Sequence, residues 1–408
     1  MKTAVRNGRV LDVHTGTFAE KTIVIEGDTI SALLGPSLPP GDDCVIIDAQ
    51  GACILPGLID AHVHVTSATV DLATPQLPIT YATCCAARHL KEALHRGFTT
   101  LRDAGGADFG LAMAVDEDVV EGSRLFYCGR ALSQTGGHGD FRAMTYDGEY
   151  GAPMQSAAST LGQVVDGVTE VRRACRAELR KGASFIKIMA SGGVASLGDK
   201  ITDTQFSHEE LAAIVEEARS RSVYAAAHAY SPKAIQICLQ HGVTSVEHGN
   251  LLDDETAIMM HEKGAFLIPT VITYDALSRR GAAFGFPAES IAKLAFVREQ
   301  ALDAIVTARK HQVRVGFGTD LLGTLWEEQS GEFLIRSSIE RPIDTIRSAT
   351  LINAELINAK GRLGELSPHA WADLLIVAGN PVDDIALLVD PNNIKLIMKA
   401  GKVYKNTL

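Results

Sequence analysis

Two histidines stand two positions apart in residues 55–65, which read Leu-Pro-Gly-Leu-Ile-Asp-Ala-His-Val-His-Val. The Pro-Gly turn is followed by an apolar run of the kind that forms a buried strand. Successive side chains of a strand point to opposite faces, so His62 and His64 share one face. Two neutral imidazoles side by side are suitable ligands for a transition metal. A His-x-His pattern also arises by chance, so this hypothesis depends on whether further ligands follow.

Further candidate ligands follow at the ends of other predicted strands. They are Lys187, His228, His248 and Asp320. Each has an ordinary structural explanation when taken alone. His228 could be a packed core histidine, and Asp320, in Gly-Thr-Asp, could belong to a turn or cap a helix. The co-occurrence of all these residue types at strand ends is what favours a metal site.

Lys187 is the unusual member of the set. It lies within Phe-Ile-Lys-Ile-Met (185–189), a strand expected to be buried on both faces. Burial without a partner lowers the pKa of a lysine and populates the neutral amine. A neutral amine can add carbon dioxide to form a carbamate, whose two oxygens can bridge two divalent ions. The alternative is a lysine that extends to solvent or pairs with a carboxylate.

The segments that carry these residues alternate between strand and helix patterns. The predicted strands are 58–65, 98–103, 124–132, 184–190, 223–228, 244–248, 266–272 and 313–319. Several are preceded by an amphipathic helix that ends in glycine, the usual left-handed cap. Residues 207–210, Ser-His-Glu-Glu, have the form of a capping box. Eight such units predict an α/β fold, a (β/α)8 TIM barrel, whose active site forms at the carboxyl ends of the strands.

Both ends of the chain contain short strands without helices between them. Each end is too small to hold a core alone. We therefore expect the two ends to pair into one discontinuous small β-sandwich. The predicted domains are residues 1–55 plus 361–408 for the sandwich and residues 56–360 for the metal-dependent barrel.

The composition limits the classes of partner. The net charge is −11, from 38 basic and 49 acidic residues, and no basic run is present, which argues against nucleic acid and anionic membranes. No apolar segment approaches the roughly 18 residues of a membrane span, and the N-terminus lacks the apolar core of a signal peptide. The seven scattered cysteines indicate reduced thiols. We expect a cytoplasmic protein that forms a homo-oligomer and acts on a small-molecule substrate.

The ligand set as a whole resembles the amidohydrolase superfamily: HxH on strand 1, Lys on strand 4, His on strands 5 and 6, Asp on strand 8. Residues 102–106, 133–138 and 189–196 more narrowly resemble the prolidase-type metallodipeptidases near imidazolonepropionase. Residues 228–231 and 246–250 fit the same branch. The resemblance covers nearly the whole chain.

The resemblance implies a binuclear centre and a mechanism. His62, His64 and Asp320 would hold one divalent ion, and His228 and His248 the second. Carboxylated Lys187 would bridge the two ions, for which Zn²⁺ fits the mixed ligands best. A hydroxide between the ions would attack the amide carbonyl, while Asp320 would carry the proton to the departing amine. Three loop residues are expected to polarise the carbonyl or bind the substrate's carboxylate: His138, Tyr230 and Arg142.

The first functional expectation is an Xaa-Pro dipeptidase (prolidase), acting on dipeptides or close N-acyl amino acids. Alternatives of the same kind are an Xaa-Arg or Xaa-Lys dipeptidase and an amidase for aromatic N-acyl amino acids of the ochratoxin type. A cyclic-amide hydrolase or deaminase on the same fold is a further alternative, although most one-metal deaminases lack the strand 4 lysine. A catalytically silent scaffold is disfavoured by the complete ligand set. The loop 141–162 over the site cannot be aligned, so the leaving amino acid stays open.

Overall fold

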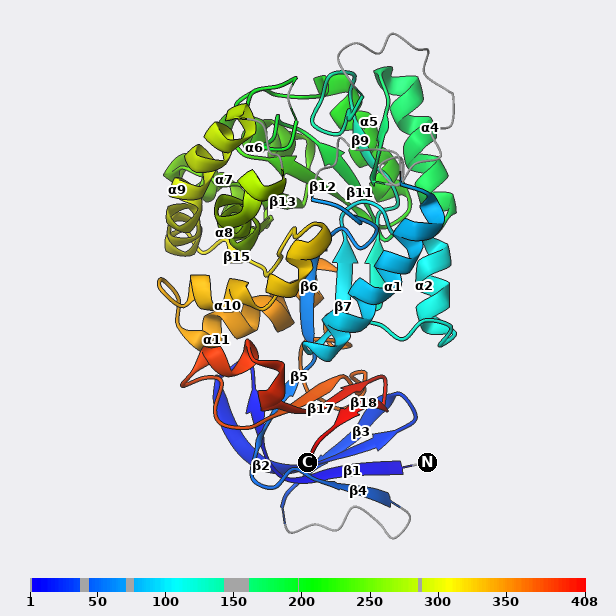
Figure 1. Ribbon diagram of the computed structural model, residues 1–408, viewed down its shortest axis with the longest axis vertical. Helices are drawn as coiled ribbons and strands as arrows, with labels where there is room; N and C mark the ends of the chain where they lie inside the picture. The colour runs from blue at the N-terminus through cyan, green and yellow to red at the C-terminus, as the bar shows by residue number, and fades with distance from the viewer. Residues whose placement is uncertain (1, 37–43, 71–76, 143–160, 197, 285–287) are drawn as a thin grey trace.

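The computed structural model describes the chain except residues 1, 37–43, 71–76, 143–160, 197 and 285–287. Most of the described chain alternates between parallel strands and helices, and a separate sheet lies at one end of the molecule, where the two termini are found (Figure 1). Four of the six predicted metal ligands lie on parallel strands, and the other two, His64 and Asp320, follow such strands. The separate sheet is built from the first and last segments of the chain.

The parallel strands form two sheets. One has the order β6 (Leu58–Val63), β7 (Phe98–Asp103), β8 (Arg124–Tyr127). The other has the order β10 (Gly162–Val164), β9 (Ala131–Ser133), β11 (Phe185–Met189), β12 (Tyr224–Ala229), β13 (Ser245–His248), β14 (Phe266–Ile268), β15 (Arg314–Val315). Backbone hydrogen bonds join the two sheets at two places. Ser184 N–H donates to Tyr127 O at 2.7 Å, and Ala61 N–H donates to Phe317 O at 2.9 Å.

Three strands differ from the sequence-based expectation. The strand predicted over 124–132 is interrupted between β8 and β9, because Gly129 adopts a left-handed backbone with φ of 74°. A glycine inside a strand pattern often marks such a break. The strand predicted over 266–272 ends at Ile268, because helix α8 (Val271–Arg280) already begins three residues later. The last predicted strand, 313–319, shortens to the two residues of β15.

Helices follow the parallel strands and cover them on the outside. They are α1 (Ile79–His95), α2 (Phe109–Asp116), α4 (Gly167–Arg180), α5 (His208–Ser220), α6 (Pro232–His241), α7 (Asp254–Glu262), α8, α9 (Ala288–Lys310), α10 (Gly331–Arg336), α11 (Pro342–Arg347) and α12 (Asn353–Leu356). The predicted capping box is confirmed, since the Ser207 and Glu210 side chains cap α5 reciprocally. Gly242 ends α6 with φ of 92°, as the glycine pattern predicts.

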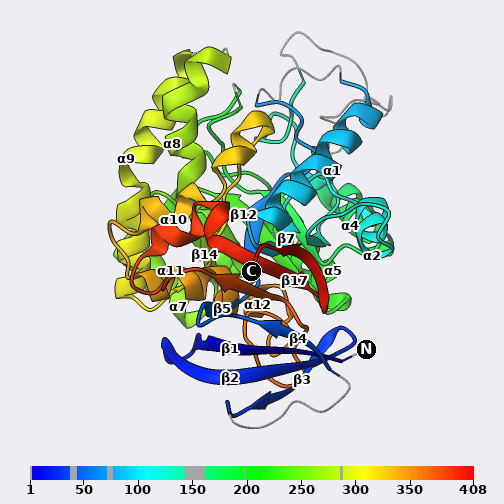
Figure 2. The same ribbon diagram turned by 60° about the horizontal axis from the view of Figure 1, so that its bottom comes forward.

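The terminal sheet contains eight strands from both chain ends. They are β1 (Lys2–Asp12), β2 (Thr17–Glu26), β3 (Thr29–Leu34), β4 (Cys44–Asp48), β5 (Cys53–Pro56), β16 (Leu374–Val377), β17 (Ile394–Lys399) and β18 (Lys402–Asn406). β5 and β16 pair antiparallel and thereby join the two ends into one sheet, which lies below the parallel strands in Figure 2. The turn from β5 to β6 passes through Gly57, where a Cβ atom would lie 2.2 Å from Thr99 Oγ1. Only glycine fits this close approach.

A buried ion pair ties β8 to the start of β16. The Arg124 guanidinium donates to both carboxylate oxygens of Asp373 at 2.7 and 3.2 Å, and the same carboxylate accepts from Ala400 N–H.

We expect Arg124→Met to lower the free energy of unfolding by about 3 kcal/mol, because it leaves a buried carboxylate without its cation. Denaturant titration would measure the change. Arg173→Met is the matched control: its side chain is 78 % exposed, so its effect should stay within about 0.5 kcal/mol. Equal effects of the two variants would contradict the expectation.

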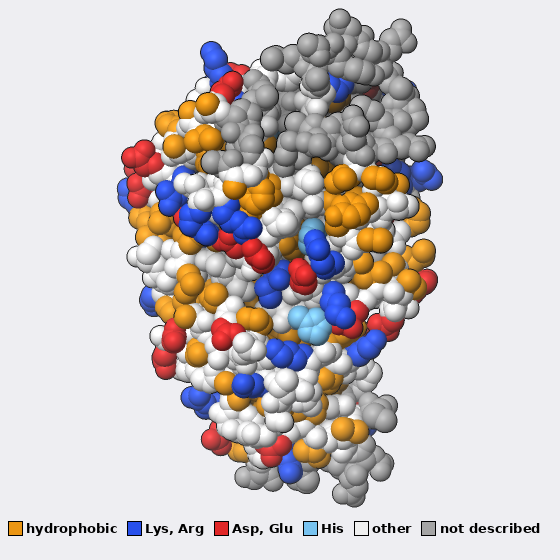
Figure 3. Space-filling model, in the orientation of Figure 1, with side chains coloured by type: hydrophobic (Ala, Val, Ile, Leu, Met, Phe, Trp, Pro, Cys, Tyr) orange, Lys and Arg blue, Asp and Glu red, His pale blue; other side chains and the backbone are white. Residues whose placement is uncertain are grey.

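The surface mixes charges of both signs. On the face shown in Figure 3, basic and acidic side chains are interspersed, so that cations on this face have nearby anions. Among the residues that the structure describes, no helix is long and apolar enough to cross a membrane.

Candidate metal centre and active site

The carboxyl ends of the parallel strands converge on one pocket. Eight of the nine residues predicted for the site line it: His62, His64, His138, Lys187, His228, Tyr230, His248 and Asp320. They come from segments that are up to 258 positions apart in the chain (62 to 320). The rest of the lining is largely apolar and includes Met189, Val194, Leu277 and Leu322. The pocket therefore places polar, chemically active groups at its base among apolar walls, as in many substrate sites.

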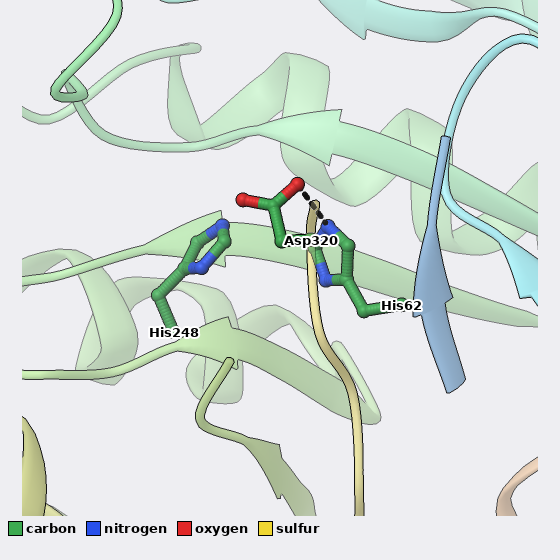
Figure 4. A group of neighbouring side chains, drawn as sticks. All are labelled: His62, His248 and Asp320. Atoms are coloured by element: carbon green, nitrogen blue, oxygen red, sulfur yellow. Dashed lines mark ion pairs between the residues drawn. The ribbon is translucent and has the colours of Figure 1, made fainter. Parts of the chain in front are cut away.

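Three of these residues offer ligand atoms close enough to share one ion. One atom from each of His62, His248 and Asp320 lies within 4.8 Å of the others. Figure 4 shows the Asp320 carboxylate between the two imidazoles. His62 Nε2 lies 3.5 Å from Asp320 Oδ1, and His64 Nε2 lies 3.3 Å from the same oxygen. The arrangement is one carboxylate oxygen faced by several imidazole nitrogens.

Three non-glycine residues with a left-handed backbone lie at or near the strand ends that carry these groups. His248, Thr270 and Asp320 all have positive φ, at 74°, 48° and 52°. A non-glycine residue in this conformation costs on the order of 1–3 kcal/mol and persists only where the surroundings impose it. His248, with its left-handed backbone, follows Glu247 directly; His248 lines the pocket, and Glu247 contacts the His62 ring.

A buried hydrogen-bond network holds the His62 ring. His62 Nδ1 lies 2.7 Å from Glu247 Oε2, and that oxygen also accepts from Arg102 Nη2 at 2.6 Å. The other Glu247 oxygen accepts from the Ser245 hydroxyl at 2.6 Å. A carboxylate can only accept, so His62 carries its proton on Nδ1. Its Nε2 lone pair is then directed to the pocket.

The other three candidate histidines each have one ring nitrogen against a protein group. The contacts are His64 Nδ1 with Gly105 O at 2.8 Å, His248 Nδ1 with Thr270 Oγ1 at 2.8 Å, and His228 Nε2 with Gly192 O at 3.2 Å. A carbonyl oxygen can only accept, so the Nδ1 of His64 and the Nε2 of His228 donate. The nitrogens that remain for a ligand are Nε2 of His64 and His248 and Nδ1 of His228. Fixing one nitrogen in this way is the usual outer support of metal-bound histidine.

The pKa shifts favour neutral imidazoles at His62, His228 and His248 and an ionised carboxylate at Asp320, whereas the pKa of His64 is raised, because the neighbouring Asp320 carboxylate outweighs the effect of burial. Burial lowers the pKa of His62 and of His228 well below the ordinary value and lowers the pKa of His248 to about 3. Burial alone would raise the pKa of Asp320, but His62 and His64 hold it below its usual range. Metal ligands must be deprotonated, and the shifts of His62, His228, His248 and Asp320 favour this state at neutral pH.

Lys187 lies in the middle of β11, opposite Ala226 of β12, and is 1 % exposed. Burial lowers the pKa of its amine, although Glu247 and Asp320 act in the opposite direction. The lysine is therefore a pocket residue, and it does not extend to solvent. A lowered pKa increases the fraction of neutral amine, which is the form that reacts with carbon dioxide.

His138 and Tyr230 lie against the candidate ligands. The His138 ring stacks on His228, with centroids 4.1 Å apart, and burial lowers its pKa to about 4. The Tyr230 ring stacks on His248 at 5.2 Å. Its hydroxyl lies 3.0 Å from that of Tyr274, a pocket residue of α8 that the sequence analysis does not identify.

Arg142 is placed differently. Its guanidinium donates to both oxygens of Asp140, at 2.6 and 2.5 Å, and it is not among the residues that line this pocket. Its predicted role in substrate binding stays a prediction. The loop 141–162 that was expected over the site falls for the most part outside the described residues.

Three residues that position the candidate ligands were not expected from the sequence: Arg102, Glu247 and Thr270. For Arg102 and Glu247 the sequence does carry one signal of a structural role. Arg102 and Glu247 are charged residues within apolar strands, and such charges need a partner when buried. The sequence alone does not show that they are partners of each other, because they lie 145 positions apart along the chain.

Comparison with known proteins agrees with this geometry. Residues 53–404 match the Amidohydrolase family. A crystal structure of a prolidase complexed with N-methylphosphonate-L-proline covers 100 % of both chains with 42 % identity and a TM-score of 0.97. A Xaa-Pro dipeptidase with bound methionine also covers both chains fully, with 29 % identity and a TM-score of 0.88. Ochratoxinase of Aspergillus niger is 34 % identical over 369 residues, which are 86 % of this chain and 75 % of that protein.

The chain belongs to the amidohydrolase family. Within it, the structural relatives place the chain in the prolidase-type branch, as the sequence motifs predict. It is a hydrolase that acts on amide bonds.

Proposed function

We propose that this hydrolase is a binuclear metal-dependent dipeptidase that cleaves Xaa-Pro dipeptides. The observation that carries the proposal is the pocket, which gathers four histidines with one ring nitrogen each left for a ligand, together with Lys187 and Asp320. The similarity to solved prolidases over the full chain supports the choice of substrate class.

We propose also that the two parallel sheets form one closed (β/α)8 barrel over residues 56–360. The hydrogen bonds from Ser184 to Tyr127 and from Ala61 to Phe317 support this proposal, because they link the two sheets at two separate places. Residues 1–55 and 361–408 would form the accompanying β-sandwich domain. Homo-oligomerisation and a cytoplasmic location remain predictions of the sequence.

The donor set fits two divalent ions, most naturally zinc, because imidazole and carboxylate are the usual zinc ligands. His62, His64 and Asp320 would hold one ion, His228 and His248 the other, and carboxylated Lys187 would bridge them. Carboxylation joins the lysine nitrogen to the carbon of carbon dioxide and releases one proton. When bound, such ions polarise a carbonyl and lower the pKa of water.

The chain's own groups would complete the reaction. Asp320, ionised in the pocket, would accept the proton of the attacking water and deliver it to the departing amine nitrogen. The Tyr230 hydroxyl would donate to the substrate, oriented by its contact with Tyr274. The apolar walls formed by Met189, Val194 and Leu277 would exclude water and accept an uncharged acyl side chain.

The proposal is tested by comparing dipeptides with their C-terminal amides at equal concentration, in Xaa-Pro, Xaa-Arg and Xaa-Phe series. We expect the zinc-loaded protein to release proline fastest from uncharged Xaa-Pro acids. The amides should react more slowly by a factor of ten or more, roughly the effect of leaving one buried polar partner unpaired. Equal rates for acid and amide would sink the idea that the carboxylate is recognised. Turnover of cyclic amides alone would favour the alternative function, a cyclic-amide hydrolase or deaminase on the same fold.

A second candidate substrate is an aromatic N-acyl amino acid. The identity of 34 % to ochratoxinase over 86 % of this chain favours it, as do the apolar walls of the pocket. The same release assay, run with N-acyl phenylalanines, distinguishes the two candidates by their kcat/KM values. The higher value identifies the preferred leaving group.

Glu247→Gln is expected to weaken metal binding by about 10- to 100-fold, the usual effect of removing an outer support of a ligand histidine. Glutamine keeps the size of the side chain but loses the charge that Arg102 and His62 share. Metal retention after dialysis against graded chelator measures the effect. Glu178→Gln, another buried glutamate, pairs with Arg130 and Lys181 and is the matched control. If both variants retain metal alike, Glu247 does not support the site.

A further inference from the structure

The first turn of α8 takes its cap from a residue 60 positions away in the chain. Its own N-cap residue, Thr270, has a left-handed backbone and makes no side-chain cap. The Thr270 hydroxyl lies instead 2.8 Å from His248 Nδ1. The first N–H groups of a helix have no partner within it, and here Ile272 N–H donates to Glu332 Oε2 at 2.7 Å. A carboxylate in this place satisfies the amide and complements the positive end of the helix dipole.

Both partners of this hydrogen bond are buried between two helices. Glu332 is fully buried, and Ile272 is 2 % exposed. Glu332 belongs to α10, which begins at Gly331, and a Cβ atom at Gly331 would lie 2.9 Å from Ile272 Cδ1. The first turns of α8 and α10 are therefore in direct contact. A buried N–H group that loses its acceptor is costly, so the position of α8 depends on this cap.

The helix that supplies the cap is itself fixed to the segment that leads to Asp320. Arg336, one turn after Glu332, is fully buried and donates to Gly316 O and to Ser348 Oγ, each at 2.8 Å. Gly316 directly follows β15 and lies four positions before Asp320. Burial raises the pKa of Glu332 to about 7, while Arg336 acts in the opposite direction. Ionised and neutral carboxyl groups both keep an oxygen that accepts, so the cap does not depend on the charge.

The capped end of α8 forms one wall of the pocket. Thr273, Tyr274 and Leu277 all line the pocket, and the Tyr274 hydroxyl lies 3.0 Å from that of Tyr230. Tyr274 stands only two positions after Ile272, so it belongs to the turn that Glu332 caps. The place of the Tyr274 hydroxyl therefore follows from the place of this first turn.

We infer that Glu332 is a positioning residue of the active site, which fixes the first turn of α8 and thereby the place where the Tyr274 hydroxyl meets that of Tyr230. Without the cap, this turn frays and the contact between the two hydroxyls opens. Tyr230 then no longer presents its hydroxyl to the substrate in one direction. The inference rests on the proposed dipeptidase function for its kinetic consequence, but not for the cap itself.

Amide hydrogen–deuterium exchange of the full-length protein, resolved to single residues, tests the cap without any substrate. Glu332→Met fills the same space but has no oxygen to accept from Ile272 N–H, whereas Glu332→Gln keeps one. We expect the Ile272 amide to exchange about tenfold faster in Glu332→Met than in the wild type, roughly the effect of losing one hydrogen bond to a charged group. Glu332→Gln should exchange at the wild-type rate. Equal rates in Glu332→Met and the wild type would overturn the inference.

A second variant covers the case in which Glu332→Met does not fold. Glu332→Asp keeps the charge beside Arg336 but is shorter, so its oxygens are withdrawn from Ile272 N–H. The same increase in exchange is expected for it. An Ile272 amide that exchanges at the wild-type rate in Glu332→Asp would contradict the cap.

Kinetics test whether Glu332 acts through Tyr274. Glu332→Met should lower kcat/KM for the best dipeptide by about tenfold at unchanged metal content, roughly the share of one hydrogen bond, and Glu332→Gln should restore it. In the Tyr274→Phe background, which lacks the hydroxyl that α8 positions, Glu332→Met should cost about twofold or less, because residues that act on one interaction have non-additive effects. A full tenfold cost in that background would contradict the role of Glu332 toward Tyr274.

Asp253→Ala is the matched control. Asp253 caps α7 by accepting from Thr256 N–H at 2.8 Å, and none of the described residues that line the pocket comes from α7. The variant should speed exchange of the Thr256 amide, as the loss of a cap predicts, and leave kcat/KM unchanged. A fall in kcat/KM equal to that of Glu332→Met would overturn the inference. If the wild type cleaves no dipeptide, the proposed function fails, and exchange at Ile272 still decides whether Glu332 caps α8.

Discussion

Asp320→Asn should lower kcat by about 10³-fold while KM changes little, within the range that general acid–base groups contribute. Asparagine keeps the size of the side chain and one oxygen that can face the imidazoles, but it cannot accept a proton. The aspartate is suited to this task because its neighbours hold its pKa below the usual range and because its left-handed backbone directs it into the pocket. A loss confined to kcat is the signature of an interaction needed in the transition state.

The test of Asp320 requires kinetics and metal content on the same preparations. Asp303→Asn, an exposed aspartate of α9, is the matched control and should behave as wild type. If Asp320→Asn loses metal as well as activity, its main role is that of a ligand. Near-normal kcat at full metal content would assign proton transfer to another group, and His138 would be tested next.

Lys187→Ala is expected to have the second large effect. The variant should lose one of two bound ions and at least 99 % of activity, because the proposed metal pair depends on this lysine. Alanine leaves a space at the centre of the pocket that lacks the two oxygens of the proposed carbamate. A short carboxylic acid such as acetate or propionate can occupy that space, and it should restore part of the activity and of the metal content.

The control for Lys187 is a second buried lysine. Lys399, on β17, is 7 % exposed and donates to Gly122 O at 2.6 Å, in the terminal sheet and away from the pocket. Lys399→Ala should reduce stability but leave the number of bound ions per chain unchanged, as measured by elemental analysis. Wild-type metal content and activity in Lys187→Ala would show that the lysine is structural.

Much of the fold could be predicted because its signals are local. Helix ends are set by caps within one turn, so Ser207 and Gly242 indicate their boundaries directly. Strand continuity is less local, and the interruption at Gly129 and the early start of α8 were not predicted. At Gly129 the backbone passes close to Glu178, where a Cβ atom would lie 2.2 Å from the carboxylate oxygen, and a propensity pattern does not report such contacts.

The types of residue available to the site, and the predicted strand ends that carry them, can be read from the sequence. The six candidate metal ligands could be found because parallel strands all present their carboxyl ends at the same edge. They are His62, His64, Lys187, His228, His248 and Asp320. The pocket gathers all six. This much needs only periodicity, caps and the common direction of the strands.

Which atom of each side chain faces the pocket depends on contacts that form only in the folded chain. The proton of His62 is placed by Glu247, 185 positions away, and His138 Nδ1 has its hydrogen-bond partner in Ser196, 58 positions away. Hydrogen-bond donors and acceptors reach only about 3 Å, so their pairing depends on the folded path of the chain and not on spacing in the sequence. For the same reason, spacing does not reveal that Arg142, which is close to the site in sequence, binds Asp140. Nor does any motif indicate that Tyr274 contacts Tyr230 in the pocket.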